Sequence, residues 1–163
     1  MASIGAFISS DEQVAEYLRY NMRSQIFAKS LPMPLVIGNL KRLELFRSKP
    51  ELKEKLWYNV NKLQKGLRER GFNMGKTNSP VTPVFLNGNP NEAANMIMDI
   101  RENYGIFLSV VVYPVVPKGV MMLRLIPTAV HTDKDIDDTL NCFTEVAEKL
   151  QSGFYLKQKL VTV

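Results

Sequence analysis

Two β-rich runs in the second half of the chain constrain its fold most. Residues 106–113 (IFLSVVVY) and 120–126 (VMMLRLI) are separated by the short segment PVVPKG. Proline fixes φ and glycine permits a positive φ, so this segment predicts a stiff loop between two antiparallel strands. Residues 81–86 are a third strand candidate, in which Pro83 favours a sheet edge or the start of a strand.

Helix-capping patterns recur through the rest of the sequence. A capping box at Ser10–Gln13 predicts a helix that runs to about residue 21, and an apolar helix is expected over residues 35–46. The capping pattern of Ser48 and Glu51 opens a longer helix that Gly71 ends. Two more helices are expected to start at Asn89 and Thr132.

Apolar residues at helical spacing mark the expected buried sides of the three longer helices. They are Leu52, Leu56, Val60, Leu63 and Leu67, then Ala93, Ile97, Ile100 and Tyr104, and finally Ile136, Leu140, Phe143 and Leu150. The order of helices, strand, helix, two strands and helix indicates an α+β fold. We expect a short, mainly antiparallel sheet with helices packed on one face.

Both ends of the chain are expected to differ from this domain. Residues 2–9 (ASIGAFIS) are typical of a buried strand, and the sequence from Gln151 onward is typical of a loosely held tail. No apolar run approaches the roughly 20 residues needed to cross a bilayer. The first residues lack the features of a signal peptide, so a cytoplasmic location is expected.

Cysteine and histidine each occur once, as Cys142 and His131. A disulfide framework, a Cys-rich zinc site and a multi-histidine metal site are therefore excluded, and no metal is expected. We interpret Cys142 as a small buried residue and His131, which precedes the last helix, as structural.

The net charge of +5 is unevenly distributed. Residues 41–76 hold eleven basic residues against four acidic ones. Lysines and glutamates alternate there at helical spacing, which is typical of a solvated helix face. A stand-alone α+β module that binds nucleic acid or another anion through this stretch stays open as an alternative.

Arg124 is the most informative single side chain. Strand alternation places Met122, Arg124 and Ile126 on one face of the run at 120–126. An arginine in this position must reach water or an acidic group, and its planar guanidinium suits a carboxylate or a phosphate. A solvent-facing or internally paired Arg124 remains the other interpretation.

Three segments together resemble one enzyme family. ASIGAF at 2–7, RSQIFAKSLP at 23–32 and NYGIFLSVVVYPVVPKGVMMLRLIPTAVHT at 103–132 are similar to the C-terminal part of the α-oxoamine synthases. These pyridoxal-phosphate enzymes join an amino acid to an acyl-CoA thioester with loss of carbon dioxide. The segments look most like bacterial serine palmitoyltransferase, and next like glycine C-acetyltransferase (2-amino-3-ketobutyrate CoA ligase).

The resemblance implies roles for individual residues. Arg124 matches the arginine that binds the substrate carboxylate, and His131 matches a family histidine to which we assign no chemical step. Residues near the acyl-CoA entrance would be Tyr113, Pro114, Pro117, Lys118 and Gly119. A segment that approaches the cofactor phosphate of the partner subunit in a homodimer would comprise Ala28, Lys29 and Ser30.

The resemblance also implies a fragment. The family's Schiff-base lysine lies just before the segment that matches residues 2–5, and no lysine of this chain occupies that position. We therefore expect a chain that is inactive alone and binds no pyridoxal phosphate by itself.

The implied fold is the small C-terminal domain of fold-type I aminotransferases. Residues 1–32 would be a remnant of the large cofactor domain and its connection, residues 33–150 the small domain and residues 151–163 a tail. The complete enzyme would condense serine with an acyl-CoA, without contact to nucleic acid. Glycine C-acetyltransferase and 8-amino-7-oxononanoate synthase are the alternatives within the family.

Overall fold

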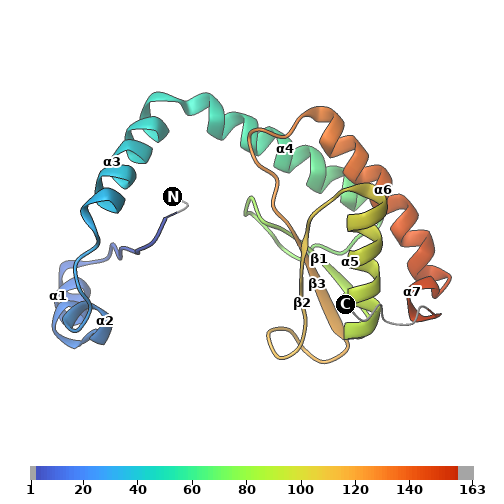
Figure 1. The fold of residues 1–163 in the computed structure, drawn as a ribbon, viewed down its shortest axis with the longest axis horizontal. Helices are drawn as coiled ribbons and strands as arrows, with labels where there is room; N and C mark the ends of the chain where they lie inside the picture. The colour runs from blue at the N-terminus through green and yellow to red at the C-terminus, as the bar shows by residue number, and fades with distance from the viewer. Residues whose placement is uncertain (1–2, 158–163) are drawn as a thin grey trace. The chain divides into compact units, whose positions relative to one another are not determined.

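The chain consists of two compact units, Met1–Pro50 and Glu51–Val163. The computed structural model describes residues 3–157 (Figure 1). The expectations for residues 1–2 and 158–163 lie outside the described residues. Because the assignment of residues 1–32 to a large cofactor domain needs a second domain for comparison, it stays a prediction.

The first unit contains α1 (Glu12–Asn21), α2 (Arg23–Ile26) and α3 (Met33–Ser48). The predicted helices ending near residue 21 and spanning 35–46 are confirmed, but none of the three helices buries a residue. The capping box at Ser10 is wrong: Asp11 is the N-cap residue, and no side chain caps α1. The Ser10 hydroxyl instead donates to the carbonyl oxygen of Asp11.

The strand predicted at residues 2–9 is wrong for the described part of that segment. Residues 3–9 form no strand, and Ile4, Phe7 and Ile8 are 72%, 86% and 58% exposed. A strand needs a neighbour to pair its backbone groups, and within residues 3–157 the sheet lies wholly in the second unit. The apolar pattern alone therefore does not make a strand here.

The second unit holds the sheet and the longer helices. Its helices are α4 (Pro50–Glu69), α5 (Pro90–Tyr104), α6 (Asp133–Gln151) and α7 (Phe154–Lys157), and its strands are β1 (Thr82–Asn87), β2 (Ser109–Val111) and β3 (Val120–Leu125). The strand order is β1-β3-β2, and both pairings are antiparallel. The predicted sheet is confirmed.

Local capping chemistry starts two of these helices as predicted. The Asn89 side chain accepts hydrogen bonds from the backbone N–H groups of Asn91 and Glu92, both at 3.0 Å. Thr132 and Asp135 form a reciprocal capping box at the start of α6. The Ser48 cap is wrong, because Ser48 is the last residue of α3 and its hydroxyl lies 3.5 Å from the Leu45 carbonyl oxygen.

The core lies against one face of the sheet. Met121, Leu123 and Leu125 of β3 are at most 5% exposed, whereas Arg124 between them is exposed. The buried strand residues pack with side chains of all three long helices, including Leu63 and Leu67 of α4, Met96 and Ile100 of α5, and Ile136, Leu140 and Phe143 of α6. Figure 1 shows α5 lying along the sheet. Helices on one face are thus confirmed.

Strand β2 is shorter than the predicted run at 106–113. The Ile106 N–H donates to the Ile100 carbonyl oxygen at the end of α5, so this N–H group does not take part in the pairing of β2 with β3. Gly105 has a φ of 66°, the left-handed conformation that commonly ends a helix. At the other end Pro114 has no N–H to donate. Three residues remain to pair with β3.

The prediction of a loose tail from Gln151 is wrong for the described residues. Gln151 ends α6, and α7 follows with Tyr155 fully buried. The Tyr155 hydroxyl donates to Asp99 at 2.7 Å, and the Lys149 amine donates to the same carboxylate oxygen at 2.8 Å. Asn103 donates to the other Asp99 oxygen at 2.7 Å. This buried carboxylate therefore anchors α7 to α5 and α6.

Burial by itself raises the pKa of Asp99, but the hydrogen bonds from Lys149, Tyr155 and Asn103 outweigh it and leave the pKa below its ordinary value. We expect Asp99→Asn to lower the free energy of unfolding by about 1–3 kcal/mol near neutral pH, measured by urea denaturation. The wild-type advantage is complete above the ordinary pKa of about 3.9 and declines as pH falls through the lower, folded-state pKa.

Glu102→Gln is the matched control, because Glu102 pairs with Arg101 on the exposed side of α5. Its effect should stay within about 0.5 kcal/mol. Equal effects of the two substitutions, or an Asp99 effect that grows on acidification, would contradict the anchoring role.

Cys142 is 1% exposed, as expected for a small buried residue. Burial, aided by the nearby charges of Asp99 and Glu145, raises the pKa of its thiol to about 12. Because the thiolate is the reactive form, Cys142 should not react with Ellman's reagent at pH 8 in the folded chain and should react fully in guanidinium chloride. Rapid labelling of the folded chain would show that this part of α6 opens readily.

Candidate functional site

Arg124 stands on the face of the sheet that points away from the core. Its backbone pairs with Pro83 of β1 and Ser109 of β2, so the residue has a strand on each side. The Arg124 Nε donates to the Ser109 hydroxyl at 3.1 Å. In the described part of the chain no ion pair includes Arg124. The terminal guanidinium nitrogens are therefore free to bind a carboxylate from outside.

The predicted active-site loop follows β2 and leads into β3. Tyr113–Pro114 is a cis peptide bond, and Gly119 has a φ of 84°, which favours glycine. The Lys118 amine lies 5.1 Å from the centre of the Tyr113 ring. The Gly119 carbonyl oxygen accepts the Gly88 N–H at 3.0 Å, so the loop is held to the segment before α5.

A cavity of about 270 Å³ lies between this loop and the start of α5. Its lining includes Tyr113, Lys118 and Gly119 from the loop and Asn89 and Pro90 from the helix start. Of the predicted loop residues, these three therefore share one cavity, and Pro114 and Pro117 are exposed.

Arg124 and the loop are carried by the same strand. Val120, Met122 and Arg124 alternate with the buried residues of β3 and so share the outer face. Arg124 lies four positions after Val120, which corresponds to about 13 Å along an extended strand. One hairpin thus presents a cation and a cavity on neighbouring parts of its surface.

Ala28, Lys29 and Ser30 lie between α2 and α3, in the unit Met1–Pro50, and all three are exposed. Exposed side chains alone do not enclose a cofactor, so by themselves these residues do not fit pyridoxal phosphate. Their contact with a cofactor phosphate stays a prediction. Within residues 3–157 no group of histidine, cysteine, aspartate and glutamate residues could hold a metal ion. No described helix is long and apolar enough to span a membrane.

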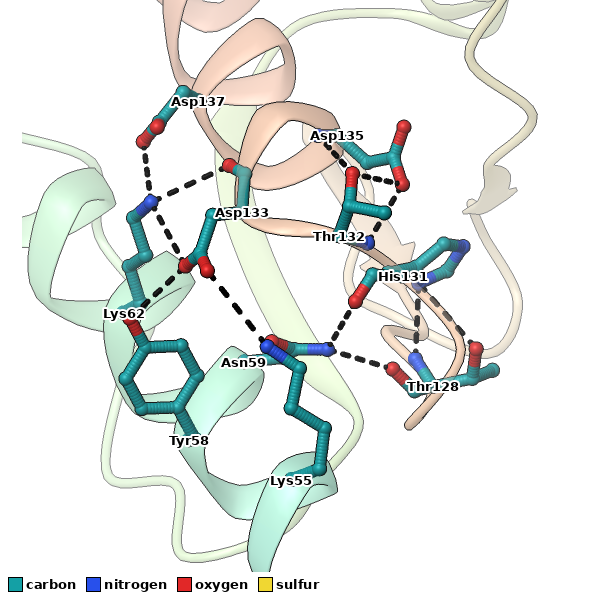
Figure 2. Close-up of polar contacts among 10 residues, drawn as sticks. All are labelled: Lys55, Tyr58, Asn59, Lys62, Thr128, His131, Thr132, Asp133, Asp135 and Asp137. Carbon is teal, nitrogen blue, oxygen red and sulfur yellow. Dashed lines mark hydrogen bonds and ion pairs between the residues drawn. The ribbon is translucent and has the colours of Figure 1, made fainter. Parts of the chain in front are cut away.

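A clasp that sequence analysis missed holds the connection from β3 to α6. The Asn59 side-chain amide, on α4, donates to the carbonyl oxygens of Thr128 and His131, both at 2.9 Å (Figure 2). The Thr128 N–H donates to His131 Nδ1 at 3.0 Å. We call Asn59, Thr128 and His131 the connection clasp. In the sequence, the sign of this contact was a polar residue, Asn59, directly before Val60 of the apolar stripe.

Beside the connection clasp, a cluster of charged side chains joins α4 to α6. Asp133 accepts hydrogen bonds from the Tyr58 hydroxyl at 2.9 Å and the Lys62 amine at 3.2 Å, and Lys62 also pairs with Asp137 at 2.8 Å (Figure 2). The hydrogen bonds from Tyr58 and then Lys62 lower the pKa of Asp133. The hydrogen bond with Asp137 raises the pKa of Lys62. Part of the basic stretch at 41–76 is therefore neutralised within the fold.

A family comparison identifies the chain. The family model for aminotransferase class I and II matches residues 1–143. The chain belongs to this family. The predicted fold, the small C-terminal domain of fold-type I aminotransferases, is confirmed by this match and by the solved structures below. The relatives that follow confirm the resemblance to the α-oxoamine synthases.

Three curated relatives illustrate the relationship. The cysteate-C-fatty acyltransferase of Capnocytophaga ochracea is 61% identical over 155 residues, which are 95% of this chain and 37% of that protein. The serine palmitoyltransferase of Sphingobacterium spiritivorum is 34% identical over 93% of this chain and 37% of its own length. The 8-amino-7-oxononanoate synthase of Exiguobacterium sibiricum is 32% identical over 91% and 37%. The chain thus spans just over a third of their length.

Solved structures show the same fold. The Sphingomonas wittichii serine palmitoyltransferase aligns with a TM-score of 0.78 at 24% identity, over 93% of this chain and 38% of that one. A serine palmitoyltransferase from S. paucimobilis, solved with a bound PLP–myriocin aldimine, aligns with a TM-score of 0.73 at 27% identity, over 84% and 34%.

Proposed function

We propose that this chain supplies the substrate-carboxylate site of a pyridoxal-phosphate-dependent enzyme that condenses an amino acid with a fatty acyl-CoA. The observation that carries the proposal is the outward Arg124, whose Nε is held by Ser109 while its terminal nitrogens have no acidic partner among residues 3–157. A guanidinium held in this way is pre-organised to bind a carboxylate through two parallel hydrogen bonds.

The reaction breaks the bond from Cα to the carboxyl group, which leaves as carbon dioxide, and forms a bond from Cα to the acyl carbon. Coenzyme A leaves as the thiolate, which takes a proton from solvent. Pyridoxal phosphate, when bound, supplies the electron sink that stabilises a carbanion at Cα. Arg124 binds the carboxylate and fixes the orientation of the amino acid, which is a contribution of position. The cofactor, its lysine and a homodimeric partner belong to the rest of the enzyme in this proposal.

For the amino acid we propose cysteate in place of the serine expected from the sequence. The 61% identical relative carries cysteate in its name, whereas the serine palmitoyltransferase is 34% identical. Both amino acids present the same α-carboxylate to Arg124, so Arg124 does not distinguish them. The cavity formed with Tyr113 and Lys118 lies on the hairpin where the family resemblance places the acyl-CoA entrance.

No observation favours the stand-alone anion-binding module. Lys41 pairs with Glu44, Lys65 with Glu69, and Lys62 with Asp133 and Asp137. These pairs fit the solvated helix face that the alternating charges indicate.

The amino-acid preference can be measured in a chimera, in which this chain replaces the 155 matched residues of the C. ochracea relative. We expect the chimera to release coenzyme A from a long-chain acyl-CoA with cysteate, and at least about ten-fold less efficiently in kcat/KM with serine or glycine, a difference of about 1.4 kcal/mol. The 163-residue chain alone, mixed with pyridoxal phosphate, is the control and should show no aldimine absorbance. A chimera that retains the cofactor but releases no coenzyme A with any of the three would refute the proposed function.

The role of Arg124 is tested in the same chimera. Arg124→Ala should lower kcat/KM for the amino acid by about 10- to 1000-fold, because the carboxylate loses its charged partner. Arg124→Lys should recover only part of the loss, since lysine lacks the planar fork. Lys65→Ala, on the exposed side of α4, is the matched control and should leave the kinetics unchanged. Normal kinetics for Arg124→Ala would remove this residue from the site.

A further inference from the structure

The connection clasp holds the turn that leads from β3 to α6. Asn59 is fully buried, and its one amide group binds both Thr128 and His131 of the connection. The His131 N–H also donates to the Thr128 carbonyl oxygen at 3.4 Å, so the turn is closed on itself. The connection is therefore fastened to α4 at two points.

The hydrogen bond from the Thr128 N–H determines which nitrogen of the His131 ring carries a proton in this arrangement. A backbone N–H can only donate a hydrogen bond, so the Nδ1 that accepts the Thr128 N–H carries no proton. The proton of the neutral ring is then on Nε2. A proton on Nδ1 would set two N–H groups against each other, and the Thr128 hydroxyl is the more distant contact of this nitrogen, at 3.5 Å.

The two bonds to carbonyl oxygens determine how the Asn59 side-chain amide is oriented. Its Oδ1 is buried and has no hydrogen-bond partner. Leaving a buried oxygen without a partner is costly, so the gain from the two donated bonds must outweigh it. Position 59 of α4 is therefore better filled by an asparagine, which donates two hydrogen bonds, than by an apolar residue like its neighbour Val60.

Arg124 is close to the clasp along the chain. Its pairing with Pro83 and Ser109 is followed by one more pair, Leu125 with Thr82, and the connection then begins. The end of β3 that carries Arg124 is therefore the end that the clasp fastens.

We propose that His131 and Asn59 are positioning residues for substrate binding, and that the neutral, Nδ1-accepting form of His131 is the competent one. The inference rests on the proposed function, because the affected step is amino-acid binding by Arg124. Loss of the Nδ1 acceptor releases the Thr128 N–H and loosens the end of β3. Amino-acid affinity then falls, while turnover of bound substrate changes little.

The ionisable residues that line a cavity together with His131 lie on two elements. Asp135 and Asp138 of α6 and Tyr104 of α5 line the same cavity as His131, which has a volume of about 390 Å³. Asp135 is engaged in the capping box with Thr132, and Asp138 pairs with Lys134. From α4 the contact to the connection is the uncharged Asn59. Loss of the acceptor on the His131 ring therefore removes one bond of the clasp and leaves the two Asn59 bonds in place.

The clasp can be tested on the 163-residue chain without any activity. Nitrogen NMR of the imidazole should show the tautomer protonated at Nε2 at pH 8. The protection of the Thr128 amide against hydrogen exchange should fall at least about five-fold in His131→Leu, which lacks the acceptor. The tautomer protonated at Nδ1, or protection that is unchanged in His131→Leu, would overturn the clasp.

The functional consequence is tested by kinetics of the chimera. His131→Asn keeps an acceptor oxygen near the Nδ1 position but does not titrate, and His131→Leu has no acceptor. We expect KM for the amino acid to rise about five-fold in His131→Leu and to stay within about two-fold of the parent in His131→Asn. In both variants kcat should stay within about two-fold of the parent.

The outcomes separate the two proposals. An inactive chimera with a normal NMR result refutes the proposed function and leaves the clasp intact. An active chimera whose His131→Leu variant keeps the KM of the parent refutes the positioning role. For His131→Leu, a fall in kcat as large as the rise in KM would also refute it, because it would indicate general damage to the fold.

Discussion

The two-sided pairing of β3 is the constraint on which the second unit depends. A strand with neighbours on both sides must divide its side chains between two faces. One face, with Met121, Leu123 and Leu125, joins the helices in the core. The other face carries Arg124, which remains at the surface although it lies in the middle of the sheet. The core and the candidate site are therefore two consequences of one alternating sequence.

Features set by neighbouring residues were predictable from the sequence. The caps of Asn89 and Thr132, the outward Arg124 and the antiparallel order all follow from local pattern. The helix start at Ser10 was misplaced by one residue, because Asp11 is the N-cap residue and no side chain caps α1. The strand predicted at 2–9 is absent from residues 3–9 because an apolar run specifies a strand only where a partner strand exists.

Contacts between distant residues were not predictable. Asn59 meets Thr128 and His131 across 69 and 72 positions of the chain, and Tyr155 meets Asp99 across 56. No local pattern announces such bonds, so the sequence indicated a loose tail where Tyr155 is anchored and a lone histidine where the clasp is formed. In both places a buried polar group supplies the order that apolar spacing does not describe.

Binding of the amino acid's α-carboxylate by Arg124 is seen most directly in a crystal structure of the chimera with cysteate bound. We expect the α-carboxylate within about 2.7–2.9 Å of the terminal nitrogens of Arg124, with Ser109 still accepting from Nε. An amino acid whose α-carboxylate is held by other residues, with Arg124 turned into solvent, would show that this arginine does not bind the substrate.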